Sequence, residues 1–319
     1  MSRWKNALLS GGAAFGVAAA FNALALRNIE AVENTIGGEQ GWFEWRGYRV
    51  SYTKRGSGPP LLLLHSIHAA ASSFEWRFNV DELARNHTVY TLDLLGFGCS
   101  DRPNVRYSAR LYTTLITDAA AQLIGAPCVL VASSLSAAYA IILGARDPER
   151  FPALVLIEPT GLVRLNRGAT TGGDFAQLTI DAPVIGTAVF NALVSRRSLA
   201  YHLARLYRND ELVTDDILDA YYVTAHQPGA KYAPSAFLSG HLNIDVRHAL
   251  RRLRQPALVI WGEHAVDTPV EDARSFLTLK SDLRLEVING VGSLPHDERP
   301  AKFNELVAAF VRESVPAQD

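Results

Sequence analysis

Short apolar runs alternate with segments of helical periodicity along most of this chain. Six runs rich in Leu, Ile or Val are expected to form strands, at residues 61–64, 87–92, 128–131, 153–157, 257–261 and 283–288. Some, such as residues 61–64, are apolar at every position, which indicates burial on both faces of a sheet. Residues 303–311 carry an apolar stripe of helical period. The alternation predicts an α/β fold with a mostly parallel central sheet and helices on both faces.

The pattern changes along the chain and so suggests how the chain is divided. Residues 42–52 predict a β-hairpin with its turn at Arg46-Gly47. From about residue 162 onward, helix-period segments follow one another without buried strands, which predicts a helical cap inserted into the core. We therefore expect an N-terminal apolar segment and linker (1–36), an α/β core (37–161 and 246–319) and a cap (162–245).

Residues 7–26 carry no charge and follow Arg3 and Lys5. Their length, about 20 residues, is enough to span a bilayer. Ala23-Leu24-Ala25 also resembles the cleavage site of a secretory signal, and a third alternative is a helix lying on the protein, a partner or a membrane surface. Low hydrophobicity per residue disfavours a span. We expect membrane association or export through residues 7–26; without either, the protein is cytoplasmic.

The remaining composition argues against several classes of function. The formal net charge is −1 and no basic run exceeds Arg251-Arg252, so nucleic acid is not an expected partner. The two cysteines, Cys99 and Cys128, are too few for a disulfide framework and are predicted to be free thiols. No dinucleotide-binding glycine motif, P-loop lysine or metal-ligand spacing is present, so we expect neither a cofactor nor a metal.

Ser134 stands where a predicted strand meets a predicted helix. The strand is the run at residues 128–131, and residues 137–146 form the helical segment that follows. A strand, a sharp turn and a helix with serine at the apex is the geometry of a nucleophile elbow. The amide of Leu135 would then lie at the helix N-terminus, where it can stabilise an oxyanion. The alternative for Ser134 is a buried structural serine.

Four segments of this chain, in order, resemble motifs of the α/β-hydrolase superfamily. They are the strand and oxyanion loop (61–68), the glycine loop (93–101), the serine elbow, and the acid and histidine segments (261–263 and 290–300). The resemblance covers about residues 42–311, and the His-Ser oxyanion loop with Gln227-Pro228-Gly229 resembles a bacterial subgroup with a degenerate triad. It implies the α/β-hydrolase fold with an inserted cap, Ser134 as nucleophile, and an oxyanion hole formed by the amides of Leu135 and Ile67.

The acid position departs from the pattern of the family. Ala265 occupies the usual aspartate position, and Asp267 follows two positions later. Some relatives place the acid at the end of the strand that precedes the cap, where this chain has Glu158. The resemblance favours Glu158 over Asp267 as the carboxylate that orients the base. In the structural alternative, Glu158 caps a loop and Asp267 is a solvated turn residue.

The histidine position departs further. Ser293 occupies it, and His296 follows three residues later at the start of the last helix. Either a shifted loop brings His296 to Ser134 as general base, or His296 is a helix-start histidine bonded to backbone. His68, beside the oxyanion loop, is a third candidate for the base, whereas His65 is expected to hold that loop in place.

The cap indicates the class of substrate. Apolar residues are dense between positions 178 and 194. Those that do not pack against the core would line an apolar pocket above Ser134. We therefore expect an esterase-like serine hydrolase with a non-standard proton relay, acting on a small apolar ester, lactone or other acyl substrate. Two alternatives stay open: a degenerate protein with a binding or scaffolding role, motivated by Ser293 and Ala265, and non-hydrolytic chemistry in the same pocket.

Overall fold

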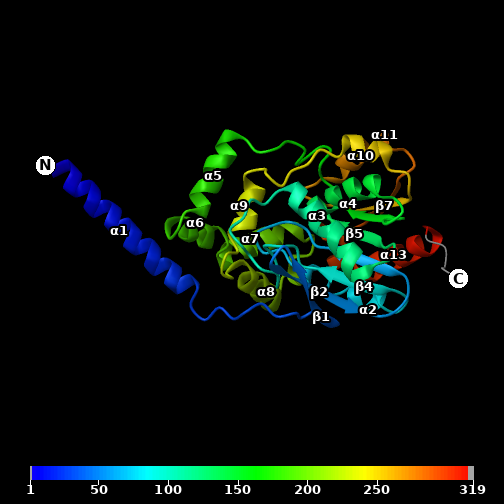
Figure 1. The fold of residues 1–319 in the computed structure, drawn as a ribbon, viewed down its shortest axis with the longest axis horizontal. Helices are drawn as coiled ribbons and strands as arrows, with labels where there is room; N and C mark the ends of the chain where they lie inside the picture. The colour runs from blue at the N-terminus through cyan, green and yellow to red at the C-terminus, as the bar shows by residue number, and fades with distance from the viewer. Residues whose placement is uncertain (1, 315–319) are drawn as a thin grey trace.

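One eight-stranded sheet forms the centre of the computed structural model, which describes residues 2–314 (Figure 1). Its strand order is β1-β2-β4-β3-β5-β6-β7-β8. The strands are β1 (Glu39–Trp45), β2 (Tyr48–Arg55), β3 (Pro60–Leu64), β4 (Thr88–Leu92), β5 (Val129–Ser133), β6 (Leu154–Ile157), β7 (Ala257–Gly262) and β8 (Arg284–Ile288). Only the pairs β1–β2 and β2–β4 are antiparallel. The predicted α/β class with a mostly parallel sheet is confirmed.

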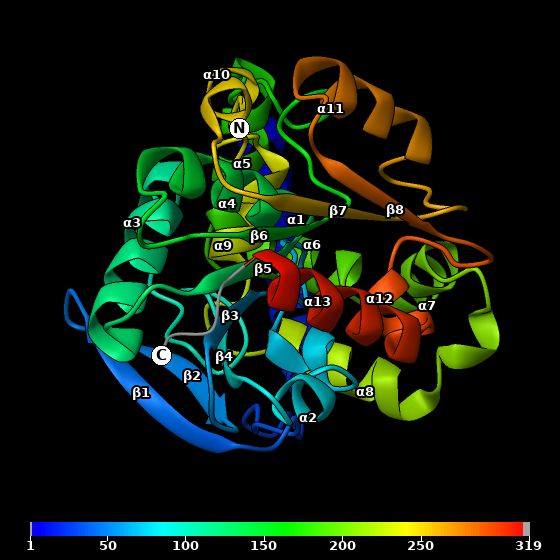
Figure 2. The same ribbon diagram turned by 90° about the vertical axis from the view of Figure 1, so that its right-hand side faces the viewer.

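Helices cover both faces of this sheet (Figure 2). One face carries α3 (Ala109–Ala119) with the short π-helical turn η2 (Ala120–Ile124), α4 (Ser134–Arg146), α10 (Arg247–Arg252), η4 (Val270–Asp272) and α11 (Ala273–Leu279). The other carries η1 (Ser73–Trp76), α2 (Val80–Leu83), α12 (Pro295–Glu298) and α13 (Pro300–Ser314). Alternate residues of a strand point to opposite faces, so Leu62 and Leu64 pack in the first layer and Leu61 and Leu63 in the second. Burial on both sides explains why this run is apolar throughout.

The N-terminal hairpin has the predicted turn. Arg46 and Gly47 connect β1 to β2 with φ values of 53° and 82°. Positive φ at both central residues is the mark of a type I′ turn, whose twist matches that of paired strands. Cys99 and Cys128 are free, as the sequence predicts.

A group of helices lies between β6 and β7 in the chain. It comprises α5 (Thr171–Asp181), α6 (Ile185–Leu193), α7 (Arg196–Leu206), η3 (Asp210–Leu212), α8 (Asp215–Ala225) and α9 (Tyr232–Leu238). These helices have an apolar cluster of their own, which includes Phe190, Leu203 and Tyr221 and reaches the core at Leu294. We call this group the cap; it covers the edge of the sheet where the parallel strands end.

The N-terminal helix α1 (Ser2–Ala25) projects from the rest of the molecule (Figure 1). Its C-terminal part contacts α6: the Asn22 amide nitrogen donates to the carbonyl of Val184 at 2.8 Å and its oxygen accepts from Asn191 at 3.0 Å. Between residues 2 and 314, no helix combines the length and the apolar character needed to cross a membrane.

Candidate active site

Ser134 occupies a sharp turn between β5 and α4. The strand ends at Ser133 and the helix begins at the next residue, so no loop intervenes. Ser134 has a φ of 54°, in the left-handed region that is unfavourable for a residue with a Cβ. The small, fully buried residues Ala132 and Ser136 stand where the elbow motif has glycines. The strand–turn–helix geometry predicted for this serine is therefore present, including the strained backbone of a nucleophile elbow.

The two amides predicted for the oxyanion hole have no hydrogen-bond acceptor among residues 2–314. Leu135 is in the first turn of α4, where an amide has no carbonyl of its own helix to bond. Ile67 lies in the loop after β3, and its amide makes no hydrogen bond to any residue between 2 and 314. Two free N–H groups beside a nucleophile are what a developing oxyanion requires.

The loop that carries Ile67 is fixed by its neighbours. His65 Nε2 accepts from the amide of Leu94 at 3.0 Å, and the other ring nitrogen therefore donates to the carbonyl of Ser66, at 2.6 Å. The hydroxyl of Ser136 donates to the carbonyl of His65 at 2.6 Å. His65 thus holds this loop against the glycine loop and the elbow helix, in the role expected for it.

Glu158 lies next to the serine, at the end of the neighbouring strand. Ser133 pairs with Ile157 in the parallel ladder, so the residues that follow, Ser134 and Glu158, leave adjacent strands about 4.8 Å apart. Glu158 also has a positive φ, of 44°, and its carboxyl accepts from the amide of Gly262 at 3.2 Å.

The surroundings of Glu158 disfavour its charged form. Only 4% of the residue is exposed. Burial raises the pKa of its carboxyl well above the usual value; the bond from Gly262 lowers it, and the carboxylates of Asp267 and Glu298 raise it further. A buried carboxyl of raised pKa next to a strained serine is the kind of group used for proton transfer.

A cavity of about 430 Å³ opens at this edge of the sheet and joins the predicted residues. Its core side includes Ser134, Glu158 and Ile67. Its cap side includes Leu206, Tyr221 and Phe237, which belong to the helices α7, α8 and α9, respectively. The carboxyl edge of a parallel sheet is where α/β proteins bind ligands.

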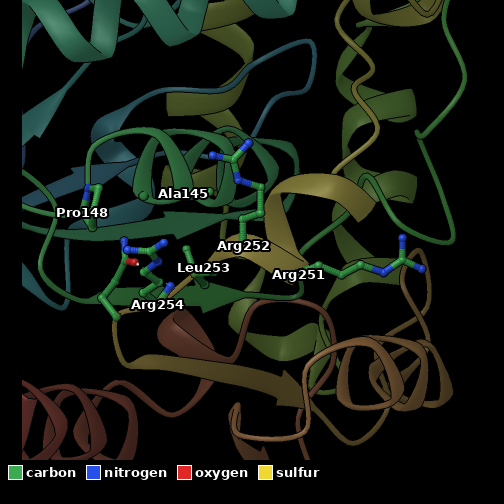
Figure 3. A pocket seen from close by; sticks show the side chains of 8 residues that line it. Ala145, Pro148, Arg251, Arg252, Leu253 and Arg254 are labelled. Atoms are coloured by element: carbon green, nitrogen blue, oxygen red, sulfur yellow. Dashed lines mark hydrogen bonds between the residues drawn. The ribbon is translucent and has the colours of Figure 1, made fainter.

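A second cavity of about 430 Å³ lies between the end of α4 and the end of α10 (Figure 3). It is lined by Arg251, Arg252 and Arg254, together with backbone that precedes β7. This position is at the amino ends of the strands, and neither a nucleophile nor a general base lines it. We therefore assign the chemistry to the cavity at Ser134.

Ser293, at the family's histidine position, has a structural role. Its hydroxyl accepts from the amide of Val266 at 3.0 Å, and its own amide donates to the carbonyl of Leu206 at 2.7 Å. The side chain thus joins the loop after β7 to the loop after β8. Asp267 lines the mouth of the cavity, but its side chain is 64% exposed and lies 3.5 Å from Arg205. Of the two candidate acids, Glu158 is the buried one.

His296 is not among the residues that line the cavity. Its ring is fully buried between Trp76 and Phe303, at centroid distances of 4.9 Å and 5.7 Å. Its Nε2 lies 3.1 Å from Glu75 Oε1, and the two atoms do not meet hydrogen-bond geometry. The imidazole packs against η1 and does not line the cavity, so this geometry does not bring His296 to Ser134. His296 lies at the start of α12, but among the described residues neither ring nitrogen makes the bond to backbone that the alternative expected.

His68 is the histidine that does line the cavity. Its ring stacks on Tyr221 with a centroid distance of 5.6 Å. Burial lowers the pKa of His68 to about 4. The charge of Glu75 has the opposite, smaller effect and raises the pKa. Its Nδ1 accepts from the amide of Ala70 at 3.2 Å, so Nε2 carries the proton of the neutral ring. In that state His68 can donate a hydrogen bond to a substrate but cannot take a proton from Ser134.

Sequence reasoning missed two residues of this site. Thr160 lines the cavity, is 3% exposed, and has no partner for its hydroxyl among the described residues. Glu75 holds the oxyanion loop through Ser66. Neither stands in a recognisable motif. Only the position of Thr160, two residues after Glu158, offered a clue.

Comparison with known proteins identifies the family and the fold. The alpha/beta hydrolase family matches residues 61–306, and the chain belongs to that family. It is 27% identical to the 2-hydroxy-6-oxo-6-(2'-aminophenyl)hexa-2,4-dienoic acid hydrolase of Metapseudomonas resinovorans, over 83% of this chain and 88% of that protein. It is 25% identical to the 2-hydroxymuconate semialdehyde hydrolase of Pseudomonas sp. strain CF600, over 84% and 92%.

Two solved structures show the same fold. A serine hydrolase involved in carbazole degradation superposes with a TM-score of 0.71 at 24% identity, covering 85% of this chain and 98% of its own. A membrane phospholipase A superposes with a TM-score of 0.71 at 20% identity, covering 99% and 100%.

Proposed function

We propose that this protein is a serine hydrolase that cleaves a small or medium apolar ester, lactone or other acyl substrate. The observation that carries the proposal is the left-handed backbone of Ser134, which lifts its hydroxyl from the sheet into a cavity of about 430 Å³. The free amides of Leu135 and Ile67 would bind the oxyanion.

Glu158 is the proposed proton acceptor. In the family pattern an acid at this position orients a histidine; here no histidine stands between, and we assign the acid the direct role. Because its pKa is raised, the ionised carboxylate is a stronger base than an ordinary one. It becomes available as the pH rises through that pKa, so hydrolysis should increase with pH over the same range.

The steps follow from these assignments. The Ser134 oxygen bonds to the carbonyl carbon of the substrate while Glu158 takes the hydroxyl proton. The tetrahedral intermediate collapses, the bond to the leaving group breaks, and Glu158 returns the proton to that group. Water then attacks the acyl-serine with Glu158 again as base, which releases the acid and restores Ser134.

The walls of the cavity support an apolar substrate. Leu165, Leu206, Phe237 and Leu294 line it beside a small number of polar groups. Pockets of this kind bind apolar ligands and use the few polar groups for orientation. The names of the two relatives, a dienoic acid hydrolase and a semialdehyde hydrolase, describe hydrolysis of carbonyl-containing substrates.

We also propose that residues 7–26 associate with a membrane surface. Large apolar side chains of α1 are exposed, including Phe15 at 51%, Val17 at 71% and Leu24 at 69%. Val17→Glu with Leu24→Glu should abolish flotation with liposomes that the wild type accompanies; equal flotation would contradict it.

A degenerate protein that binds a ligand without turnover is the second candidate. The observation that favours it is the structural use of Ser293, whose hydroxyl holds the amide of Val266 where the family has its base. Such a protein would bind apolar ligands in the same cavity and show no Ser134-dependent reaction.

Hydrolysis of a series of p-nitrophenyl esters distinguishes the two candidates. Ser134→Ala should abolish turnover, and Glu158→Gln should lower kcat by about 100-fold or more, the usual contribution of a general base. Asp267→Asn is the matched control, a carboxylate at the mouth of the same cavity, and should retain most of the activity. Turnover that survives Ser134→Ala would refute the proposal.

A further inference from the structure

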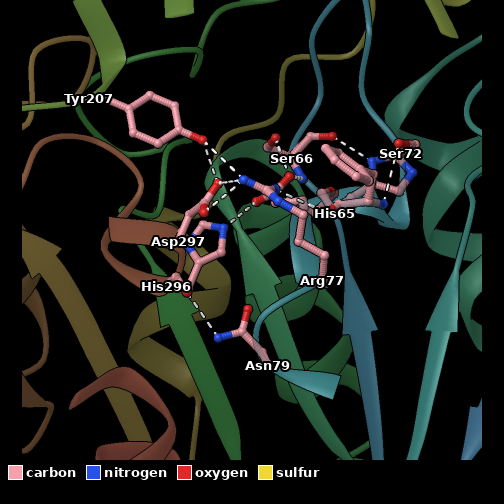
Figure 4. A network of polar contacts seen from close by, with 11 residues as sticks. His65, Ser66, Ser72, Arg77, Asn79, Tyr207, His296 and Asp297 are labelled. Atoms are coloured by element: carbon pink, nitrogen blue, oxygen red, sulfur yellow. Dashed lines mark hydrogen bonds and ion pairs between the residues drawn. The ribbon is translucent and has the colours of Figure 1, made fainter. Parts of the chain in front are cut away.

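A buried polar chain connects the oxyanion loop to α12 (Figure 4). Glu75 Oε2 accepts from the amide of Ser66 at 2.8 Å and from its hydroxyl at 2.6 Å. Ser66 directly precedes Ile67, whose amide is one of the two proposed oxyanion donors. The carboxylate of Glu75 therefore fixes the peptide unit next to that donor.

The other carboxylate oxygen of Glu75 faces His296. The distance from Oε1 to His296 Nε2 is 3.1 Å, and the two residues are 4% and 0% exposed. His296 is held in turn: its carbonyl accepts from the side-chain amide of Asn79 at 2.9 Å. Thus η1 and α12, which lie far apart in the sequence, fix one carboxylate between them.

A second pair, formed two residues after Glu75 and one residue after His296, connects α12 to the cap. Arg77 donates to both carboxylate oxygens of Asp297, at 2.8 Å and 2.6 Å. Asp297 also accepts from the hydroxyl of Tyr207, which follows α7 of the cap. The first pair reaches the oxyanion loop and the second reaches the cap.

Stability alone is a weak reason for a buried carboxylate, because apolar residues of similar volume often stabilise as well or better. Such a group does fix direction, since it must keep its polar partners. The two bonds to Ser66 require an ionised carboxylate for full strength, and the nearby imidazole favours that form.

We propose that Glu75 is a positioning residue for the oxyanion hole, which aims the amide of Ile67 into the cavity through Ser66, and that His296 supports Glu75 in this role. The inference rests on the proposed function, because an oxyanion hole matters only if Ser134 attacks a carbonyl. It assigns His296 a task in the reaction without direct contact with Ser134.

Glu75→Gln, Glu75→Ala and His296→Gln test the proposal against Asp297→Asn. The control removes a charge of similar burial from the neighbouring residue of α12, in the pair that leads to the cap. We expect kcat to fall about 10-fold in Glu75→Gln and about 100-fold in Glu75→Ala, with KM within twofold, because one oxyanion donor is worth about 100- to 1000-fold. His296→Gln should resemble Glu75→Gln, and Asp297→Asn should keep the wild-type kcat.

A transition-state analogue gives a readout that general loss of structure does not. Affinity for an aryl boronic acid should fall in parallel with kcat across the Glu75 variants, while affinity for an apolar hydrocarbon of similar size, which has no oxygen for the oxyanion hole, stays constant. Wild-type kcat and boronate affinity in a folded Glu75→Gln would overturn the inference.

Hydrogen exchange separates this inference from the function it rests on. Amide exchange in residues 65–71, followed by mass spectrometry, should be faster in the Glu75 variants and unchanged in Asp297→Asn. If the wild type shows no Ser134-dependent turnover, the proposed function fails. Unchanged exchange in the Glu75 variants overturns the positioning role whether or not turnover exists.

Discussion

Replacing Glu75 with Gln should lower the free energy of unfolding by about 3 kcal/mol at neutral pH. Burial raises the pKa of this carboxyl, but the adjacent His296 and the bonds from Ser66 outweigh that effect and lower it from 4.5 to about 2. At 1.36 kcal/mol for each unit of pKa, a lowering of this size corresponds to about 3 kcal/mol. Gln keeps the shape of the side chain and removes its charge.

The sign of the pH dependence follows from the direction of that shift. A carboxyl whose folded-state pKa is depressed contributes stability above its unfolded pKa and loses it as the pH falls toward the folded value. The difference between wild type and Glu75→Gln should therefore be full above about pH 5 and shrink steadily as the pH falls from 4.5 toward 2.

Urea unfolding followed by tryptophan fluorescence at several pH values measures this difference. Glu82→Gln is the matched control, because Glu82 is a half-exposed partner of Arg85 on the neighbouring helix, and its effect should stay within about 0.5 kcal/mol. A Glu75→Gln difference that is below 1 kcal/mol at neutral pH, or that does not vary with pH, would refute the ionised, paired carboxylate.

Three further predictions concern the elbow and its surroundings. Glu158→Gln should become increasingly stable relative to wild type above pH 4.5, because the raised folded-state pKa makes the wild type lose stability there; urea titrations measure it. Ser134→Gly should exceed Ser134→Ala in stability by roughly 0.5 to 1 kcal/mol in thermal unfolding, because glycine relieves the positive φ. Gly98→Ala should destabilise by at least about 1 kcal/mol in urea, because φ is 52° and the new Cβ would meet the Asp93 carboxyl.

Local sequence pattern was sufficient for the features that depend on neighbouring residues. The strand before Ser134 and the helix after it adjoin in the chain, so the elbow follows from one short segment. The turn at Arg46-Gly47 and the two-faced burial of residues 61–64 have the same local origin. Glu158 came from a family resemblance, and its adjacency to Ser134 depends on strand register.

Features that depend on packing between distant segments were not predictable. His296 resembles a base in the sequence because it follows the family's histidine position. Its actual partner, Glu75, lies more than 200 residues away on η1, and no motif marks that residue. Likewise, the hydroxyl of Ser293 accepts from the amide of Val266 only because the tertiary fold brings two loops together. Contacts of this kind are set by the tertiary fold.

The central claim is that Ser134 is an activated nucleophile, and labelling with a fluorophosphonate probe tests it most directly. Peptide mass spectrometry on wild type and Ser134→Ala, both verified as folded by circular dichroism, identifies the modified residue. We predict an adduct on Ser134 in the wild type, formed faster as the pH rises, and none in the variant. A folded wild type that stays unlabelled, or a label that persists in Ser134→Ala, would contradict the account.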